Sequence, residues 1–168
     1  DAAGNDATLT LATPGAANSL GNSKALIVDT SVPTISSVSL NAANSQLTVT
    51  FAEDVYTNDV SGNLVAADFA LSITGGAATV AATPTGITKT SQSIWILDLN
   101  ISGTANGSET LDVVPAAGNA IYDKAGNAAS TSQSNNTATL TEKILPTITN
   151  LAIYDTYFNG LIDKIIVT

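Results

Sequence analysis

The chain has 168 residues, with 14 acidic side chains against 5 basic ones and a formal net charge of −9, and it contains no Arg, His, Cys or Met. The absence of histidine excludes a Ser-His-Asp triad and an imidazole base, and the absence of cysteine excludes thiol nucleophiles, disulfides and iron–sulfur clusters. An acidic chain without arginine also disfavours nucleic acid and anionic membranes as partners, because both bind basic surfaces.

The acidic residues are mostly Asp, which favours turns and binds hard cations, whereas Glu favours helices. No apolar run approaches the length of about 18 residues that spans a bilayer, so we expect no membrane insertion. Residues 1–6 lack the basic start and apolar stretch of a signal peptide, so a targeting segment would lie outside this sequence. The predominance of small polar and small apolar residues favours an extracellular location.

The predicted elements are short β-strands with period-two alternation of apolar and polar side chains. In chain order they cover residues 34–40, 45–51, 91–99, 109–114 and 137–141, and residues 65–69 are the one stretch with helical character. Turn-forming pairs separate them, at Gly62-Asn63, Gly75-Gly76, Asn106-Gly107 and Gly126-Asn127 among others. Many short strands punctuated in this way predict an all-β immunoglobulin-like antiparallel β-sandwich, with Trp95, Phe51, Phe69 and Tyr122 as its large core residues.

Three short segments recur in the same order, which indicates a period of about 115–120 residues. Residues 1–5 resemble 123–127, residues 29–38 resemble 142–151, and residues 47–50 resemble 165–168. We therefore expect a tandem-repeat module with partial flanking repeats. Residues 1–28 would be the C-terminal strand segment of a preceding repeat, 29–142 a complete sandwich, and 143–168 the N-terminal strands of a following repeat. The flanking pieces could pair with each other, with the central sandwich, or with another chain.

The order of several landmarks resembles prokaryotic immunoglobulin-like repeats. These landmarks are Asp29-Thr-Ser-Val-Pro33-Thr-Ile, Leu47-Thr-Val-Thr-Phe51-Ala-Glu53-Asp54-Val, Ala66-Ala-Asp68-Phe69 and Tyr122-Asp123-Lys-Ala-Gly126-Asn127, and the resemblance covers residues 29–142. Such repeats occur in surface-layer proteins and in large cell-surface adhesins, where they are strung end to end. The resemblance therefore implies an extracellular, cell-surface protein whose partners are neighbouring repeats of the same polypeptide, with possible self-assembly between copies.

The topology of such a sandwich predicts that acidic side chains gather at one end, the pole at which the linker enters. A first strand runs away from the entering linker and a second returns, so residues 53–54 should lie beside the linker. The loop 123–127 precedes a strand that also runs away from the linker, so it should lie there too. The expected group is Asp29, Glu53, Asp54, Asp123 and Asn127. Ca²⁺ takes 6–8 oxygen ligands, so this pole is a candidate calcium site; the alternative is ordinary turn chemistry on a solvated rim.

A second candidate calcium loop runs from residue 155 to residue 163. Asp155, Asn159 and Asp163 stand at the first, fifth and ninth positions of an EF-type loop, with Gly160 at the sixth. Tyr157 and Ile166 stand where such a loop has an acid or amide and a bidentate Glu. The alternative is a β-hairpin with Asn-Gly at its tip.

Catalysis is not expected. Glu53 with Asp98 or Asp112 could form a carboxylate pair for glycoside hydrolysis, but the two aspartates lie within alternating strands whose polar positions normally face solvent. A buried Lys–Asn bond and an ice-binding row of threonines are weaker alternatives. The sequence thus favours a structural repeat of a surface-layer or cell-envelope assembly with calcium at its junctions, and alternatively a spacer or ligand-binding repeat of a large adhesin.

Overall fold

The computed structural model describes residues 3–4, 12–17, 19–23, 28–57, 61–158 and 160–167. Within these ranges the protein is all-β, as predicted, with one short helix, α1 (Leu20–Ser23), and one 3₁₀ turn, η1 (Ala66–Asp68). The strands are β1 (Ile35–Leu40), β2 (Gln46–Phe51), β3 (Phe69–Thr74), β4 (Thr79–Val80), β5 (Gly86–Lys89), β6 (Ile94–Asp98), β7 (Ile101–Ser102), β8 (Thr110–Pro115), β9 (Thr137–Thr139), β10 (Leu151–Tyr154) and β11 (Lys164–Val167).

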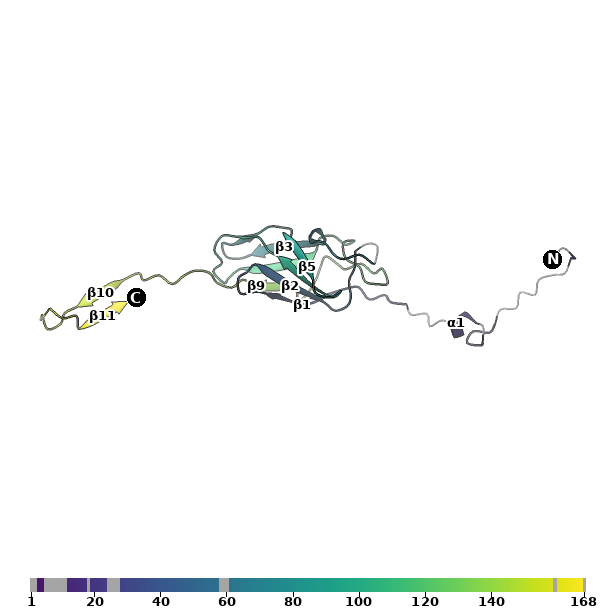
Figure 1. Cartoon of the computed structure of the whole chain (residues 1–168), viewed down its shortest axis with the longest axis horizontal. Helices are drawn as coiled ribbons and strands as arrows, with labels where there is room; N and C mark the ends of the chain where they lie inside the picture. Colours follow the sequence, from purple (N-terminus) through teal and green to yellow (C-terminus); the bar gives the residue numbers. More distant parts are fainter. Residues whose placement is uncertain are drawn as a thin grey trace.

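Every strand pair is antiparallel. One sheet has the order β1-β2-β6-β5 and a second has the order β3-β8-β9, while β4-β7 and β10-β11 form two-stranded ribbons. The two larger sheets contribute to a single hydrophobic core, an arrangement consistent with a β-sandwich (Figure 1).

The core follows from the alternation of the strands. In β2 and β8 every second side chain is buried, including Leu47, Val49, Leu111 and Val113 at 0% exposure. Burying one such aliphatic side chain stabilises the fold by about 1.5–3 kcal/mol, so the alternation accounts for most of the drive to pack the sheets.

The large residues of the core were mostly predicted. Trp95 is buried near the start of β6 and donates its indole N–H to the Gln92 carbonyl at 3.0 Å. Phe51 and Phe69 contact each other with ring centroids 6.3 Å apart. The prediction for Tyr122 was wrong: its side chain is only half-buried, because it lies in isolated bridges to Tyr56 and Ala128 at the end of the sandwich.

The two connecting segments leave the sandwich from opposite ends (Figure 1). The exit segment is fastened by the loop after β1, where Asn44 donates to the Thr141 carbonyl at 2.7 Å and accepts from the Thr141 N–H at 2.9 Å. Asn44 has a φ of 59°, a left-handed conformation that asparagine tolerates better than most residues. Lys143 adds a hydrogen bond from Nζ to the Ala42 carbonyl at 2.6 Å.

Beyond this exit the chain forms the β10–β11 hairpin. Its register pairs Leu151 with Val167 and Ile153 with Ile165. The β1–β2 hairpin pairs apolar residues in the same manner, Val38 with Val49 and Leu40 with Leu47. Among the described residues no helix is long and apolar enough to cross a membrane.

Candidate metal centre

Four of the five predicted pole residues are brought together: three carboxylates and the side chain of Asn127. Asp29, Glu53 and Asp123 each place a carboxylate oxygen within 4.8 Å of the others, and the described part of the chain has no other such acidic group. Asp29 belongs to the entering segment, Glu53 follows β2, and Asp123 begins the loop before β9. The exposed side chain of Asp54 lies outside this group. We call Asp29, Glu53 and Asp123 the acidic triad.

Backbone hydrogen bonds explain why Glu53 lies at this pole. β2 ends at Phe51, and the next residue, Ala52, donates to the Thr34 carbonyl at 2.9 Å, which ties the end of β2 to the start of β1. Tyr56 and Tyr122 then exchange hydrogen bonds of 2.7 Å and 2.9 Å. This antiparallel bridge holds the segment after Glu53 beside the segment before Asp123.

A tight loop orders Asp123, which is completely buried. Its Oδ1 accepts from the Asn127 backbone N–H at 2.8 Å, and its Oδ2 accepts from the Asn127 side-chain amide at 2.7 Å. Gly126 has a φ of 90°, a conformation that an L side chain rarely adopts, so the turn requires glycine at this position.

Asn127 connects this loop to the entering segment. Its side-chain Nδ2 donates to the backbone carbonyl of Asp29 at 3.0 Å as well as to Asp123. The Asp29 carboxylate in turn accepts from the Ser31 N–H at 3.0 Å, which shapes the linker just before β1. Asn127 was predicted as a metal ligand; in the structure its side-chain nitrogen clamps the linker to the pole.

The electrostatics of the triad differ from residue to residue. Burial raises the pKa of Glu53, and the neighbouring charges of Asp123 and Asp29 raise it further. Burial also acts to raise the pKa of Asp123, but hydrogen bonds from Asn127 and from the N–H groups of Ala125 and Gly126 outweigh it, so that pKa is lowered. The electrostatics therefore favour the ionised form of Asp123, whereas the neighbouring negative charges oppose the ionisation of Glu53.

The donor set of the triad suits a hard cation. All three side chains offer carboxylate oxygens, the ligands that Ca²⁺ prefers, and no nitrogen or sulfur ligand is present to favour a transition metal. Three carboxylates supply only part of the 6–8 oxygens of a calcium ion, so backbone carbonyls or water would complete the shell.

The second predicted calcium loop is a hairpin loop in the structure. One oxygen of Asp163 accepts from the N–H groups of Thr156 and Tyr157 at 2.7 Å and 3.3 Å, and an oxygen of Asp155 accepts from the Gly160 N–H at 2.8 Å. Both carboxylates therefore stabilise the turn between β10 and β11. Asn159, the third predicted ligand, lies outside the described residues.

Sequence reasoning missed one buried carboxylate, that of Glu109. It has 0% exposure and accepts backbone hydrogen bonds from Ala77, Ala78, Asn106 and Gly107 at 3.0–3.2 Å. Burial would raise the pKa of Glu109, but hydrogen bonds from the N–H groups of Ala78, Ala77, Glu109 itself and Asn106 outweigh it and lower the pKa. A glutamate directly before an apolar strand and next to Asn106-Gly107 is the signal that could have identified it.

Glu109 organises loops away from the triad. A Cβ on Gly76 would collide with the Glu109 carboxylate, so glycine is required where the loop after β3 passes over it. Because its hydrogen bonds come from two separate loops, Glu109 is assigned to fold stability and not to a site.

Comparisons of this chain with known protein families, with curated proteins and with solved structures found no match.

Proposed function

We propose that the protein is a structural immunoglobulin-like repeat of an extracellular surface-layer or cell-envelope assembly, with Ca²⁺ bound by the acidic triad at the junction where the chain enters the sandwich. The observation that carries the proposal is the place of Asp29. It belongs to the entering segment, yet its carboxylate lies with those of Glu53 and Asp123 from the sandwich. An ion held by all three would fix the direction in which the linker leaves.

The repeat hypothesis is supported by the two hairpins. β10–β11 pairs apolar residues as β1–β2 does, and each hairpin follows a Pro-Thr-Ile segment, at Pro33 and Pro146. These features fit a complete repeat over residues 29–142 and opening strands of another over 143–168.

A mechanical role is supported by the way both connecting segments are fastened. At the entry, Asn127 donates to the Asp29 carbonyl; at the exit, Asn44 makes two hydrogen bonds to Thr141. The two segments leave from opposite ends of the sandwich (Figure 1). Tension along the chain would therefore pass through the whole sandwich, as expected of a unit in a linear array.

Calcium would have a modest effect on the free energy of unfolding and a larger effect on the position of the linker at the junction. A site with a Kd of about 0.1 mM in about 1 mM Ca²⁺ stabilises the folded state by about 1.4 kcal/mol. The ion would also remove the mutual repulsion of the triad, which otherwise pushes the linker carboxylate away from the sandwich.

The absence of native cysteine allows a direct test by pairwise spin labelling. Cysteines introduced at Val28, in the entering segment, and at Thr88, on β5, would report the linker direction by electron–electron double resonance. We expect 1 mM Ca²⁺ to narrow the distance distribution, and a chelator to broaden it again. The same pair carrying Asp123→Asn should not respond. An unchanged distribution in the unsubstituted protein would refute calcium stiffening at this junction.

A spacer or ligand-binding repeat of a large adhesin is the second candidate. The opposite exits of the two segments favour it equally, because a stalk needs the same end-to-end geometry. Electron microscopy after calcium addition separates the two: a surface-layer role predicts ordered two-dimensional arrays, and an adhesin role predicts isolated rods.

A further inference from the structure

The loop between β7 and β8 contains an asparagine followed by a glycine, Asn106-Gly107, and the asparagine side chain is held in place. The Oδ1 of Asn106 accepts a hydrogen bond from the Ser108 backbone N–H at 2.9 Å and another from the Ser108 hydroxyl at 2.5 Å. Because both donors belong to the residue beyond Gly107, the side chain of Asn106 is folded back over the Gly107 peptide nitrogen. Asn106 is exposed, so water reaches its carboxamide.

Gly107 presents this nitrogen without steric hindrance. Its N–H donates to the Glu109 carboxylate at 3.1 Å, and a hydrogen bond in the peptide plane does not occupy the faces from which the nitrogen attacks. Gly107 has a φ of 82°, a conformation that other residues rarely adopt, and it has no Cβ beside the nitrogen. The carboxamide carbon of Asn106 and the nitrogen of Gly107 are thus an electrophile and a nucleophile held within one turn.

We propose that Asn106-Gly107 is a self-modification site, at which the chain converts Asn106 to isoaspartate or aspartate without an enzyme or a cofactor. Solvent base removes the Gly107 N–H proton, and the nitrogen attacks the Asn106 Cγ. The N–Cγ bond forms, the bond from Cγ to Nδ2 breaks, and the departing nitrogen takes a proton from water and leaves as ammonia. Water then opens the cyclic imide at either carbonyl. Opening at the main-chain carbonyl gives isoaspartate, and opening at Cγ gives aspartate.

Ser108 assists the step that forms the imide. The attack places negative charge on the Asn106 Oδ1, which already accepts two hydrogen bonds from Ser108. Donors fixed in advance at an oxygen that becomes negative stabilise the transition state, and losing one such donor from a buried site slows a reaction about 100-fold or more. Because Asn106 is exposed, water replaces part of a lost donor, and we expect removal of the hydroxyl to slow the conversion about fivefold.

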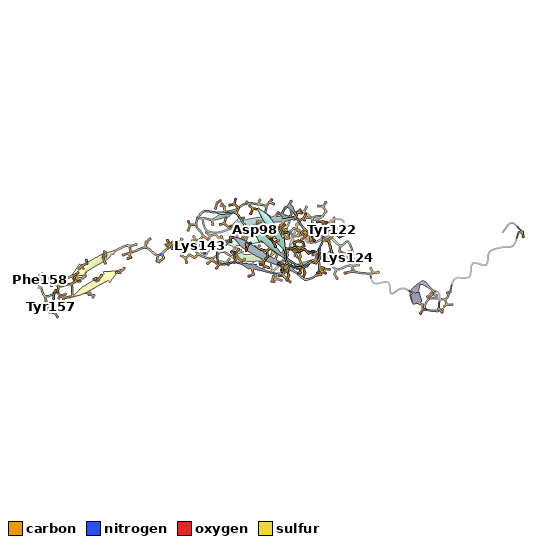
Figure 2. All side chains as sticks on the ribbon, viewed as in Figure 1. Asp98, Tyr122, Lys124, Lys143, Tyr157 and Phe158 are labelled. Carbon is orange, nitrogen blue, oxygen red and sulfur yellow. The ribbon has the colours of Figure 1, made fainter. Side chains whose placement is uncertain are left out.

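The exit segment rests on this loop. The Lys143 N–H donates to the Ala105 carbonyl at 2.8 Å, and a Cβ on Gly107 would lie 3.5 Å from the Glu142 Cβ. Figure 2 shows Lys143 at the end of the sandwich opposite Lys124, which belongs to the loop that carries one of the triad carboxylates. The modification therefore acts at the exit, and it does not depend on calcium at the entry.

Isoaspartate would loosen the exit. It adds a carbon to the main chain and leaves a free carboxylate near Glu109, which is buried and accepts from the Asn106 and Gly107 N–H groups at 3.0 Å and 3.1 Å. Repulsion between the two carboxylates and the longer main chain displace these hydrogen bonds, and the Ala105 carbonyl moves away from the Lys143 N–H. The conversion accumulates with the age of the molecule, so older molecules have a looser exit segment.

The reaction is tested by incubating the whole chain at mildly alkaline pH in a chelator. Peptide mapping by mass spectrometry follows the gain of about 1 Da at Asn106, and electron-transfer fragmentation distinguishes isoaspartate from aspartate. Ser108→Ala removes the hydroxyl donor, whereas Ser108→Thr keeps it and is the matched control. We expect Ser108→Ala to convert about fivefold more slowly than the parent, and Ser108→Thr to convert at the parent rate. In urea, where the turn is lost, all three proteins should convert at one rate.

The consequence for the exit is tested with Asn106→Gln, because the longer glutamine side chain cyclises far more slowly. After the same incubation, amide hydrogen exchange at Lys143 should be faster by about tenfold or more in the converted parent. In Asn106→Gln it should stay at its starting value.

Three results would overturn the proposal. The first is no conversion at Asn106 in the folded chain over a period in which the chain in urea converts most of its molecules. The second is equal rates for folded Ser108→Ala and Ser108→Thr, which would remove the role of the turn. The third is unchanged exchange at Lys143 in converted molecules, which would separate the modification from the exit segment.

Discussion

Replacing Glu53 by glutamine removes one of three like charges while keeping the shape of the side chain. The carboxylate oxygens of the triad lie within 4.8 Å of one another. At that distance two unit charges repel by about 0.9 kcal/mol in water and about 3.5 kcal/mol at an effective dielectric constant of 20. Because Asp29 is exposed and Glu53 only half-buried, solvent screening brings each repulsion close to the lower value.

Glu53→Gln should therefore stabilise the protein in a chelator by about 1–2 kcal/mol, a rise in Tm of roughly 5 °C. In about 1 mM Ca²⁺ this difference in stability should narrow by about 1 kcal/mol. Calcium bound with a Kd of about 0.1 mM stabilises the unsubstituted protein by about 1.4 kcal/mol, whereas calcium bound tenfold more weakly stabilises the variant by about 0.4 kcal/mol. Calcium should thus raise the Tm of the unsubstituted protein by several degrees and barely change that of the variant.

Thermal unfolding followed by circular dichroism, with and without chelator, measures both effects. Asp54→Asn is the matched control, because Asp54 is an adjacent acid that lies outside the triad. A lower Tm for Glu53→Gln in chelator would refute the repulsion argument. An equal calcium increment in Glu53→Gln and Asp54→Asn would refute the metal site.

Three further predictions follow from the buried polar groups. Glu109→Gln replaces an acceptor of four backbone N–H groups by an amide that offers one oxygen, so the Tm should fall by roughly 10 °C in a scan at pH 7, and an unchanged Tm would contradict the assigned role. Asn127→Ala removes the donor to both Asp29 and Asp123, so the free energy of unfolding in urea should fall by about 1–2 kcal/mol; a loss below about 0.3 kcal/mol would contradict the clamp. Glu109 and Asp123 have lowered pKa values, so their ionised forms should stabilise the folded protein fully above about pH 4.5. That stabilisation should be lost as the pH falls through their pKa values in the folded state. Glu53 has a raised pKa, so it should act oppositely and lower the free energy of unfolding as the pH rises through its pKa in the folded state. Urea unfolding of the parent protein and of Glu53→Gln between pH 2 and pH 7 measures both pH effects. If the free energy of unfolding of the parent does not decrease when the pH is lowered below about 4, the effect predicted for Glu109 and Asp123 is contradicted.

The strands could be predicted because their alternation is a local property. The segments that form β2, β6 and β8 carry an apolar residue at every second position, so each strand has one apolar face. Two sheets built from such strands bury these faces between them. Strand direction alone then placed Glu53 and Asp123 at the entry pole. Asp54 could not be assigned in this way, because adjacent residues in extended backbone point to opposite sides.

The contacts of Glu109 with the loop at Ala77 and Ala78, and the turn contacts of Asp155 and Asp163, are not contained in any alternating strand pattern. Glu109 is buried because two loops more than 25 residues apart point their N–H groups at it. Asp163 binds backbone donors seven and six residues earlier in the chain. The ligand spacing of an EF-type loop and the spacing of a hairpin turn are similar, so the sequence alone does not distinguish them.

The most direct test of the account is a calcium titration of the whole chain followed by backbone amide NMR. Calcium binding at the entry junction predicts saturable shifts, with a Kd of about 0.1 mM, concentrated at Asp29, Glu53 and the Asp123–Asn127 loop. The amides of β10 and β11 should not move. Absence of saturable shifts at the triad, or shifts confined to the loop between Asp155 and Asp163, would contradict calcium binding at the entry junction.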